Sequence, residues 1–202
     1  LSKSRSVNIL SAARLFLFAA RDVWFVVALP VYLASQLGWD HWAVGGFLAV
    51  WVIGYGIVQT LAPKITGNRQ AKSQLIDSAP DGRSALIWAS MLAFVPALIA
   101  CSIQFSFYPE ASLLLGLMLF GALFAVNSSL HSYLIVSYAS EDAVSLDVGF
   151  YYMANAMGRL VGTVLSGLVY QAYGLAACLW ISTAFIGITA MISIKLPRQV
   201  AE

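Results

Sequence analysis

The sequence predicts an all-α membrane protein, and composition and segment length are the observations that predict it. Hydrophobic residues make up 60% of the 202 residues and charged residues only 10%, and the mean hydropathy is +0.82. A soluble domain carries roughly 25% charged residues, so this composition argues against a soluble enzyme, a nucleic-acid binder and a disordered chain. The apolar stretches are also continuous over about 20 positions, the length of a helix that spans a bilayer, whereas outer-membrane strands alternate over about ten residues.

Six apolar segments are long enough to span a membrane. We expect helices at about 9–37, 42–62, 84–105, 111–137, 146–173 and 175–196. Pro30 and Pro96 are expected to kink the first and third segments. The first segment is too long for a secretory signal and has no cleavage pattern. The two cysteines, Cys101 and Cys178, lie in apolar runs and fit no metal spacing, so we expect them to pack as small residues.

The cations between the segments indicate which end is cytoplasmic. The connections at 38–41, 104–110 and 171–174 contain no Lys or Arg. Eight of the eleven Lys and Arg residues flank the opposite helix ends: Lys3, Arg5, Lys64, Arg69, Lys72, Arg83, Lys195 and Arg198. The connection at 138–147 carries Glu141, Asp142 and Asp147, but acidic residues contribute little to the positive-inside rule. We therefore expect a multi-pass protein of the cell (inner) membrane with both termini of this segment in the cytoplasm.

Three arginines and one aspartate fall inside the predicted spans. A charge at the bilayer centre costs about 2.5–3.5 kcal/mol on insertion scales, so such residues usually face a bundle interior or a wet cavity. Arg14 lies within about two turns of the cytoplasmic end, where it could instead snorkel to the interface. Arg21 lies about 10 Å deeper on nearly the same face, and Arg159 lies close to the midplane. We expect Arg21 and Arg159 to be functional; the alternative is a buried ion pair that holds helices together.

Asp22 is the obvious partner for these cations. Adjacent helical residues point about 100° apart, so we expect Asp22 not to face Arg21. It could reach Arg159 on another helix, or it could carry a proton. The sequence leaves both roles open.

The fifth predicted span carries a stripe of polar and small residues at three- or four-residue steps: Tyr151, Asn155, Arg159, Gly162 and Ser166. A second set, spaced by four, forms a small-xxx-small face that allows close helix approach in lipid: Ala154, Gly158, Gly162 and Ser166. Packing explains the small residues but neither Asn155 nor Arg159.

Two other spans carry weaker signals. The fourth holds Asn127 and His131 near its middle, and His131 is either a proton relay or a hydrogen-bonded helix contact. In the second, Trp51, Tyr55 and Gln59 recur at steps of four. Such a stripe is equally typical of a cavity wall and of a packed core.

Several function classes lack their motifs. The sequence has no Gly-x-Ser-x-Gly elbow of a serine hydrolase, no paired Asn-Pro-Ala half-helices of a water channel and no P-loop of a nucleotide-driven pump. It also has no clustered carboxylate or His ligand set. We therefore expect no enzyme activity and no cofactor or metal. A secondary transporter needs buried charge and kinked helices, which this chain has.

The arrangement of the spans resembles one half of a major facilitator superfamily transporter. The features that carry this resemblance are six spans, a long basic loop after the second and both termini inside. The stretch Gly158-Arg159-Leu160-Val161-Gly162, followed by Leu165-Ser166-Gly167 and by Tyr170 to Gly174, resembles the eleventh helix of that superfamily. The resemblance implies that residues 1–8 end a central cytoplasmic loop, 9–196 form the C-terminal six-helix half and 197–202 form a cytoplasmic tail. Leu1 is no natural start, so we expect a fragment whose partner is the N-terminal six-helix half of the same protein.

A narrower resemblance, to the organoarsenical efflux permeases, rests on two stretches. They are Ala20-Arg21-Asp22-Val23-Trp24-Phe25-Val26-Val27-Ala28-Leu29-Pro30 and Gly45-Gly46-Phe47-Leu48-Ala49-Val50-Trp51-Val52-Ile53-Gly54-Tyr55-Gly56. That family is taken to export 1-arseno-3-phosphoglycerate, which gives arsenate resistance. One departure is that residues 62–69 lack the acidic residue of the superfamily's cytoplasmic signature.

The resemblance implies a small anionic substrate, and arginine binds phosphate-like oxyanions bidentately. We expect substrate binding by Arg14, Arg21, Arg159, Asn155, Tyr151 and Asn127, and proton coupling by Asp22 and His131. The partners expected are this anion and the lipid bilayer, with no nucleic acid. The alternatives are a transporter of another organic anion or organophosphate, and a non-transporting membrane sensor or assembly subunit.

Overall fold

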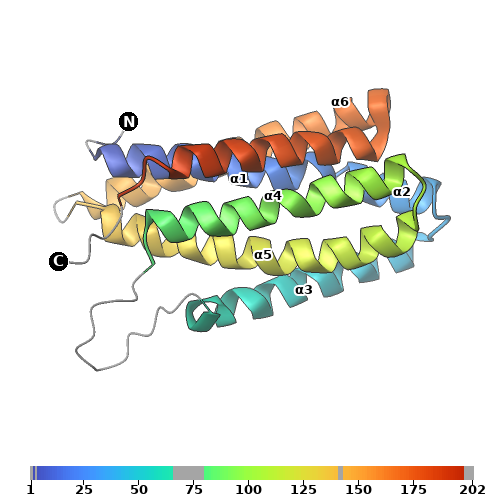
Figure 1. Ribbon diagram of the computed structural model, residues 1–202, viewed down its shortest axis with the longest axis horizontal. Coiled ribbons are helices and arrows are strands. Elements are labelled where there is room, and N and C mark those ends of the chain that lie inside the picture. The colour runs from blue at the N-terminus through green and yellow to red at the C-terminus, as the bar shows by residue number, and fades with distance from the viewer. Residues whose placement is uncertain (1, 3, 66–79, 141–142, 198–202) are drawn as a thin grey trace.

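The chain forms a bundle of long helices. The structure, a computed structural model, describes residues 2, 4–65, 80–140 and 143–197. Its helices are α1 (Arg5–Phe25), α2 (Ala28–Ser35), α3 (His41–Ile65), α4 (Gly82–Gln104), α5 (Pro109–Tyr138) and α6 (Val144–Ser193). The α2–α3 and α4–α5 connections lie at one end of the bundle, and the start of α1 lies at the other (Figure 1).

Five helical segments among the described residues are long and apolar enough to cross a membrane: Arg5–Ser35, His41–Ile65, Gly82–Gln104, Pro109–Tyr138 and Val144–Ser193. The predicted class, an all-helical chain compatible with a multi-pass membrane protein, is confirmed at this level. The predicted cations at Lys3, Arg69, Lys72 and Arg198, and the acidic Glu141 and Asp142, lie outside the described residues.

The first predicted span is interrupted as its proline suggests. Helix α1 ends at Phe25, and α2 begins at Ala28, two residues before Pro30. Pro30 has no N–H to donate to the carbonyl of Val26, so the helical ladder fails there. The hydroxyl of Ser166 in α6 accepts the freed N–H of Ala28 at 3.0 Å. By contrast, α4 stays one helix through Pro96, so the kink expected there does not interrupt it.

Helix α6 contains a reversal. Gly174 has φ 76° and ψ −175°, which lies outside the helical region and favours glycine. Residues on either side, 144–173 and 175–193, are helical, and Figure 1 shows the chain turning back on itself at this end of the bundle. The predicted boundary between the fifth and sixth spans falls at the same glycine.

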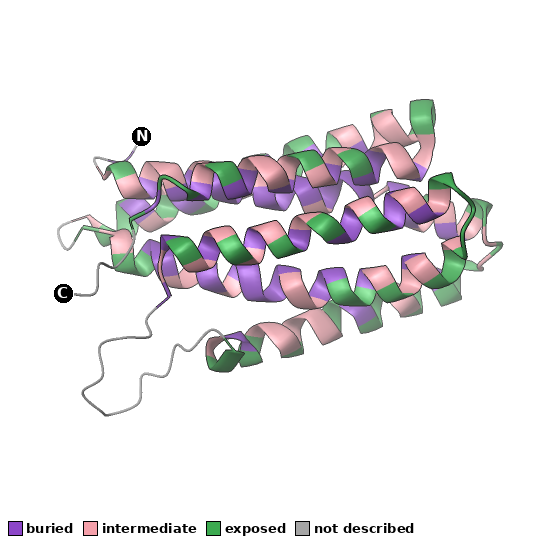
Figure 2. Cartoon of the chain, in the orientation of Figure 1, coloured by how far each residue is buried: buried purple, intermediate pink, exposed green. Residues whose placement is uncertain are grey.

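Helix α1 lies against α6 at very short range. A Cβ placed on Gly158 would collide with the carbonyl oxygen of Leu15 and lie 2.9 Å from its carbonyl carbon. A Cβ on Gly162 would lie 2.7 Å from the carbonyl oxygen of Ala19. Ala154, Gly158, Gly162 and Ser166 are all buried, which confirms the predicted small-residue face. Figure 2 shows the buried residues turned toward the inside of the bundle.

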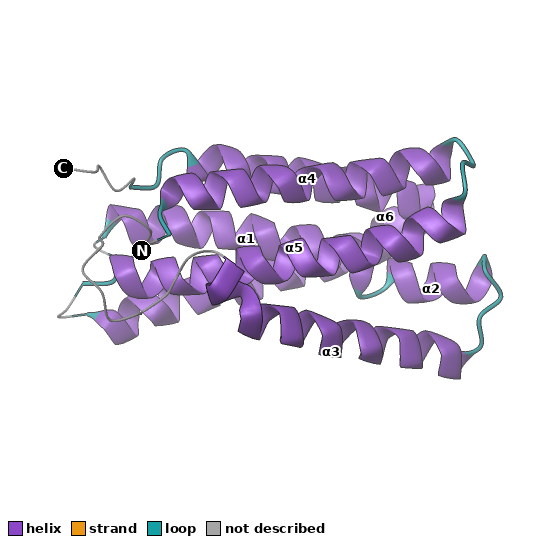
Figure 3. Cartoon of the chain, turned by 60° about the horizontal axis from the view of Figure 1, so that its bottom comes forward, coloured by secondary structure: helices purple, strands orange, loops and turns teal. Residues whose placement is uncertain are grey.

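Helix α3 lies at the edge of the bundle (Figure 3) and packs on α5. The Trp51 indole N–H donates to the carbonyl oxygen of Leu117 at 2.8 Å. Its ring lies against Gly121, where a Cβ would come within 3.0 Å of it. The Trp51 side chain is therefore part of the packed core, while Tyr55, stacked on it with centroids 5.9 Å apart, is half-buried.

Candidate functional site

The helical register of α1 and α6 brings the charged residues to the same level. The two helices start at the same end of the bundle (Figure 1). At about 1.5 Å per residue, Arg21 lies about 24 Å along α1 and Arg159 about 22 Å along α6. The close approach at Gly158 and Gly162 then places the two arginines on either side of one narrow interface.

Asp22 joins these two arginines. Its Oδ1 accepts from Nε of Arg21 at 2.6 Å, and its Oδ2 accepts from Nε of Arg159 at 3.2 Å. The Asp22 side chain is completely buried, whereas the side chains of Arg21 and Arg159 are 14% and 57% exposed. The predicted reach from Asp22 to Arg159 is present.

The prediction that Asp22 cannot face Arg21 is wrong. It compared only the directions in which neighbouring Cβ atoms leave the helix. An arginine side chain is long enough to fold around the helix, and its Nε reaches the carboxylate of the next residue.

Arg14 is a buried cation held by neutral groups. Its Nε donates to the amide oxygen of Asn155 at 3.0 Å, and its Nη1 donates to the carbonyl oxygen of Ser128 at 3.1 Å. The residue is only 4% exposed, so the snorkelling alternative is not what the structure shows. Arg14 therefore ties α1 to both α5 and α6 without a carboxylate partner among the described residues.

Aromatic rings line the space between the two arginines of α1. The guanidinium of Arg14 lies 4.0 Å from the ring centroid of Phe18, and that of Arg21 lies 5.0 Å from the same centroid. Arg21 also lies 5.3 Å from the ring of Phe124. Such cation–π contacts are worth about 0.5–2 kcal/mol, more when water is excluded.

Phe18 was not among the predicted site residues, although its spacing from the two arginines offered a signal. It lies four residues after Arg14 and three before Arg21, so helical periodicity places all three on one face. Phe124 and the Ser128 carbonyl come from α5, and no spacing within α1 or α6 could have indicated them.

The site carries a surplus of positive charge. Three arginines and one aspartate give a formal charge of +2. In the part of the chain that the structure describes, Arg21 and Arg159 use only Nε for hydrogen bonds. The terminal nitrogens of both guanidinium groups thus have no hydrogen-bond acceptor among the described residues, and a planar guanidinium binds carboxylate or phosphate oxygens in pairs.

The other predicted site residues lie nearby in different roles. Tyr151 is buried, and its ring centroid lies 5.0 Å from the Arg14 guanidinium. His131 is buried, and neither ring nitrogen has a hydrogen-bond partner among the described residues, so the expected helix contact through hydrogen bonding is absent there. Asn127 donates to the carbonyl oxygens of Trp88 and Leu123, so it joins α5 to α4 and makes no bond to the arginines.

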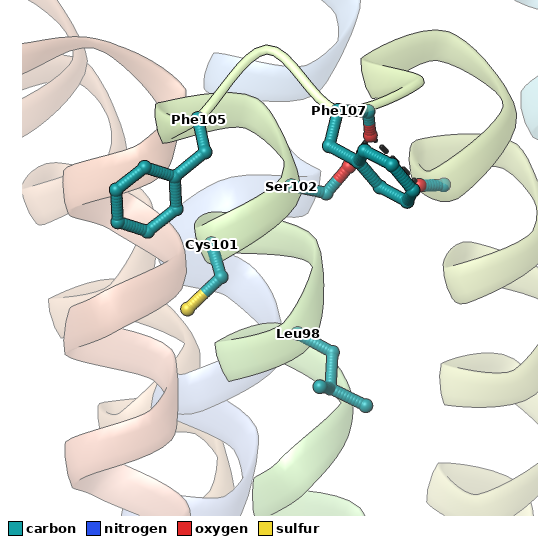
Figure 4. A pocket seen from close by; sticks show the side chains of 6 residues that line it. Leu98, Cys101, Ser102, Phe105 and Phe107 are labelled. Carbon is teal, nitrogen blue, oxygen red and sulfur yellow. Dashed lines mark hydrogen bonds between the residues drawn. The ribbon is translucent and has the colours of Figure 1, made fainter.

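A separate hollow of about 520 Å³ lies at the α4–α5 turn (Figure 4). Its lining consists of Leu98, Cys101, Ser102, Phe105, Phe107 and Ser112. The Ser102 hydroxyl donates to the Phe107 carbonyl and stabilises this turn. The hollow contains no ionisable carboxylate or cationic side chain, so the arginine cluster is the stronger candidate site.

No family model and no curated protein matches this chain.

Proposed function

We propose that this chain belongs to a secondary active transporter that moves a small organic anion across the cell membrane. The observation that carries the proposal is the group of Arg14, Arg21 and Arg159 with one carboxylate between them. Burying a cation in a membrane bundle is expensive, and intramembrane ionisable residues commonly mark substrate or ion pathways.

The chemistry of the site favours an oxyanion. Arg21 and Arg159 come from different helices and have terminal nitrogens without an acceptor among the described residues. Two such forks can bind two oxygens each, which suits a phosphate or a carboxylate better than a neutral or cationic solute. The surplus charge of +2 suits a ligand with at least two negative charges.

We propose that the chain crosses the membrane six times. Helices α1 and α2 together cross once, and α6 crosses twice because the chain reverses at Gly174. The described cations Arg5, Lys64, Arg83 and Lys195 all lie at helix ends opposite the α2–α3 and α4–α5 connections, which supports a cytoplasmic location for that end. The six passes would form the C-terminal half of a major facilitator carrier, with substrate bound between this half and its partner.

The resemblance to organoarsenical efflux permeases makes 1-arseno-3-phosphoglycerate the first substrate to test. This compound carries phosphate and arsenate groups, both of which are oxyanions that arginine forks can bind. Its export would give arsenate resistance. Proton coupling by Asp22 or His131 stays a prediction.

Arsenate resistance tests this proposal in a cell that lacks its own arsenate exporters. The complete gene is expressed together with a glycolytic dehydrogenase that forms the substrate. We expect Arg21→Ala and Arg159→Ala each to abolish resistance, because each removes one fork, while the protein level in the membrane stays normal. Arg83→Ala is the matched control, since Arg83 is an exposed arginine at the start of α4. Full resistance in both cluster variants would contradict the proposal.

A second candidate function has its own supporting observation. Asp22 bridges α1 and α6, as expected of an ion pair that only holds helices together in a sensor or assembly subunit. That function predicts that exchanging the charges, with Asp22→Arg and Arg159→Asp combined, restores the melting temperature lost by either change alone. Restored stability, together with no arsenate resistance from the wild-type protein, would favour this candidate.

A further inference from the structure

Asp22 touches each arginine of the pair at one atom only. We infer that Asp22 is a built-in counter-ion, which holds the Nε edges of Arg21 and Arg159 and presents their terminal nitrogens to the substrate. It is a positioning residue that sets how strongly the site discriminates between anions of different charge. This inference rests on the proposed function and deepens it.

The hydrogen-bond geometry supports this role. An arginine has five N–H donors, one on Nε and four on the terminal nitrogens. Asp22 takes the single Nε donor of each arginine, with a different oxygen for each. A carboxylate that competed with substrate would instead take the terminal fork, the edge that binds oxyanions in pairs. Asp22 leaves both forks for another acceptor.

The packing around Asp22 keeps the carboxylate in place. The residue is completely buried, and a Cβ on the facing Gly162 would lie 2.9 Å from the Asp22 Cβ. Gly162 stands three residues after Arg159 on the same helical face. Because the backbones of α1 and α6 are this close, Asp22 has little room to move away from the two arginines.

The same geometry gives Asp22 an effect on charge selectivity. The cluster carries a formal charge of +2, which becomes +3 when Asp22 is replaced by Asn and +1 when Arg159 is replaced by Gln. The double variant returns to +2. Coulomb energy scales with the product of charges, so each change acts more strongly on a highly charged ligand than on a singly charged one.

The proton-carrier role expected of Asp22 makes a different demand. A proton carrier must bind and release a proton at Asp22, which would neutralise the carboxylate to which both guanidinium groups now donate. The counter-ion role requires no such step, because the carboxylate keeps both partners while substrate binds on the far side of each fork.

Calorimetric titration of the purified full-length protein at pH 8 tests the inference. The probes are 3-phosphoglycerate, which carries about three negative charges at this pH, and glycerate, which carries about one. The readout is the ratio of the two dissociation constants, glycerate over 3-phosphoglycerate. We expect this ratio to rise at least fivefold in Asp22→Asn and to fall at least fivefold in Arg159→Gln. Adding Asp22→Asn to Arg159→Gln should raise the ratio at least fivefold above that of Arg159→Gln, because these two variants differ only at residue 22.

Asp147→Asn is the matched control. Asp147 is also buried in this bundle, but it accepts from Ser2 and Ser140 and makes no bond to an arginine, so its ratio should not change. If Asp22 has only a structural role, Asp22→Asn should weaken the binding of both probes equally and leave the ratio of dissociation constants unchanged. That result overturns the inference. So does proton uptake on binding that is present in the wild type and lost in Asp22→Asn.

The double variant gives a second comparison, because it and Arg159→Gln both lack the Arg159 fork and differ only at residue 22. If Asp22→Asn alone does not fold, an equal ratio in the double variant and in Arg159→Gln refutes the role. Failure of the wild type to bind either probe would contradict the proposed function itself. Binding with an unchanged ratio in Asp22→Asn contradicts only the role of Asp22.

Discussion

The close approach between Gly158 of α6 and the backbone of Leu15 in α1 provides a quantitative test of the fold. Gly158→Ala adds one methyl group to α6. That methyl would collide with the Leu15 carbonyl oxygen and lie 3.0 Å from its Cα. All the atoms it meets belong to the backbone of a helix, so no side chain can rotate away and α1 itself must shift.

The size of the effect follows from two opposing terms. Overpacking a well-packed interior costs about 1–3 kcal/mol, and a rigid backbone neighbour places this site at the upper end. Alanine is favoured over glycine in a helix by about 1 kcal/mol, which offsets part of the cost. We expect a net loss of about 2 kcal/mol, or about 4–8 °C in melting temperature for a chain of this size.

Thermal unfolding in detergent, followed by circular dichroism, measures this loss. Gly167→Ala is the control, because Gly167 lies on the same helix and a Cβ there would meet nothing within 4 Å. The helix-propensity gain is common to both variants, so the difference between them isolates the clash and should be about 3 kcal/mol. Equal melting temperatures for the two variants would refute the close packing of α1 on α6.

Two further variants test single hydrogen bonds. Ser166→Ala leaves the buried N–H of Ala28, at the start of α2, without its acceptor, and it should lower the free energy of unfolding by about 1–3 kcal/mol in the same assay. Ser182→Ala is the control, because it removes a buried hydroxyl that has no hydrogen-bond partner among the described residues. It should lower the free energy of unfolding by less than about 1 kcal/mol. Arg14→Lys keeps the charge, but an ammonium group cannot reproduce the planar guanidinium that now bonds to both α5 and α6. This variant should weaken 3-phosphoglycerate binding about tenfold, measured by calorimetry. An unchanged affinity would show that only the charge of residue 14 matters for binding.

The helices could be predicted because their signals are local. Uninterrupted apolar runs gave bounds within a few residues of those observed for α3, α4 and α5. Gly174 marked the reversal in α6, and Pro30 marked the break before α2. The four-residue spacing of small side chains identified the face of α6 that meets α1. Each of these features depends on residues near one another in the sequence.

The site was only partly predictable, because it depends on how far each side chain extends and on residues that other helices contribute. The four charged residues could be identified by their cost in lipid, and so could the reach from Asp22 to Arg159, but their other partners could not. Sequence spacing gave no indication that Arg14 would bond to the Ser128 carbonyl, since that bond needs the packing of α1 on α5. The rule for adjacent residues failed at Asp22 because it ignored the length of arginine.

The imbalance of charge is the strongest argument for a binding role. If these residues served only to hold helices together, each buried cation would be expected to have its own carboxylate, because an unpaired charge in a bundle is costly. Asp22 instead serves two arginines, and Arg14 has only neutral acceptors. Two uncharged polar residues in place of Asp22 and Arg159 would link α1 and α6 at lower cost. An anion bound at the terminal nitrogens would offset the surplus, so the proposed anion binding would account for the three-to-one ratio, which packing alone does not explain.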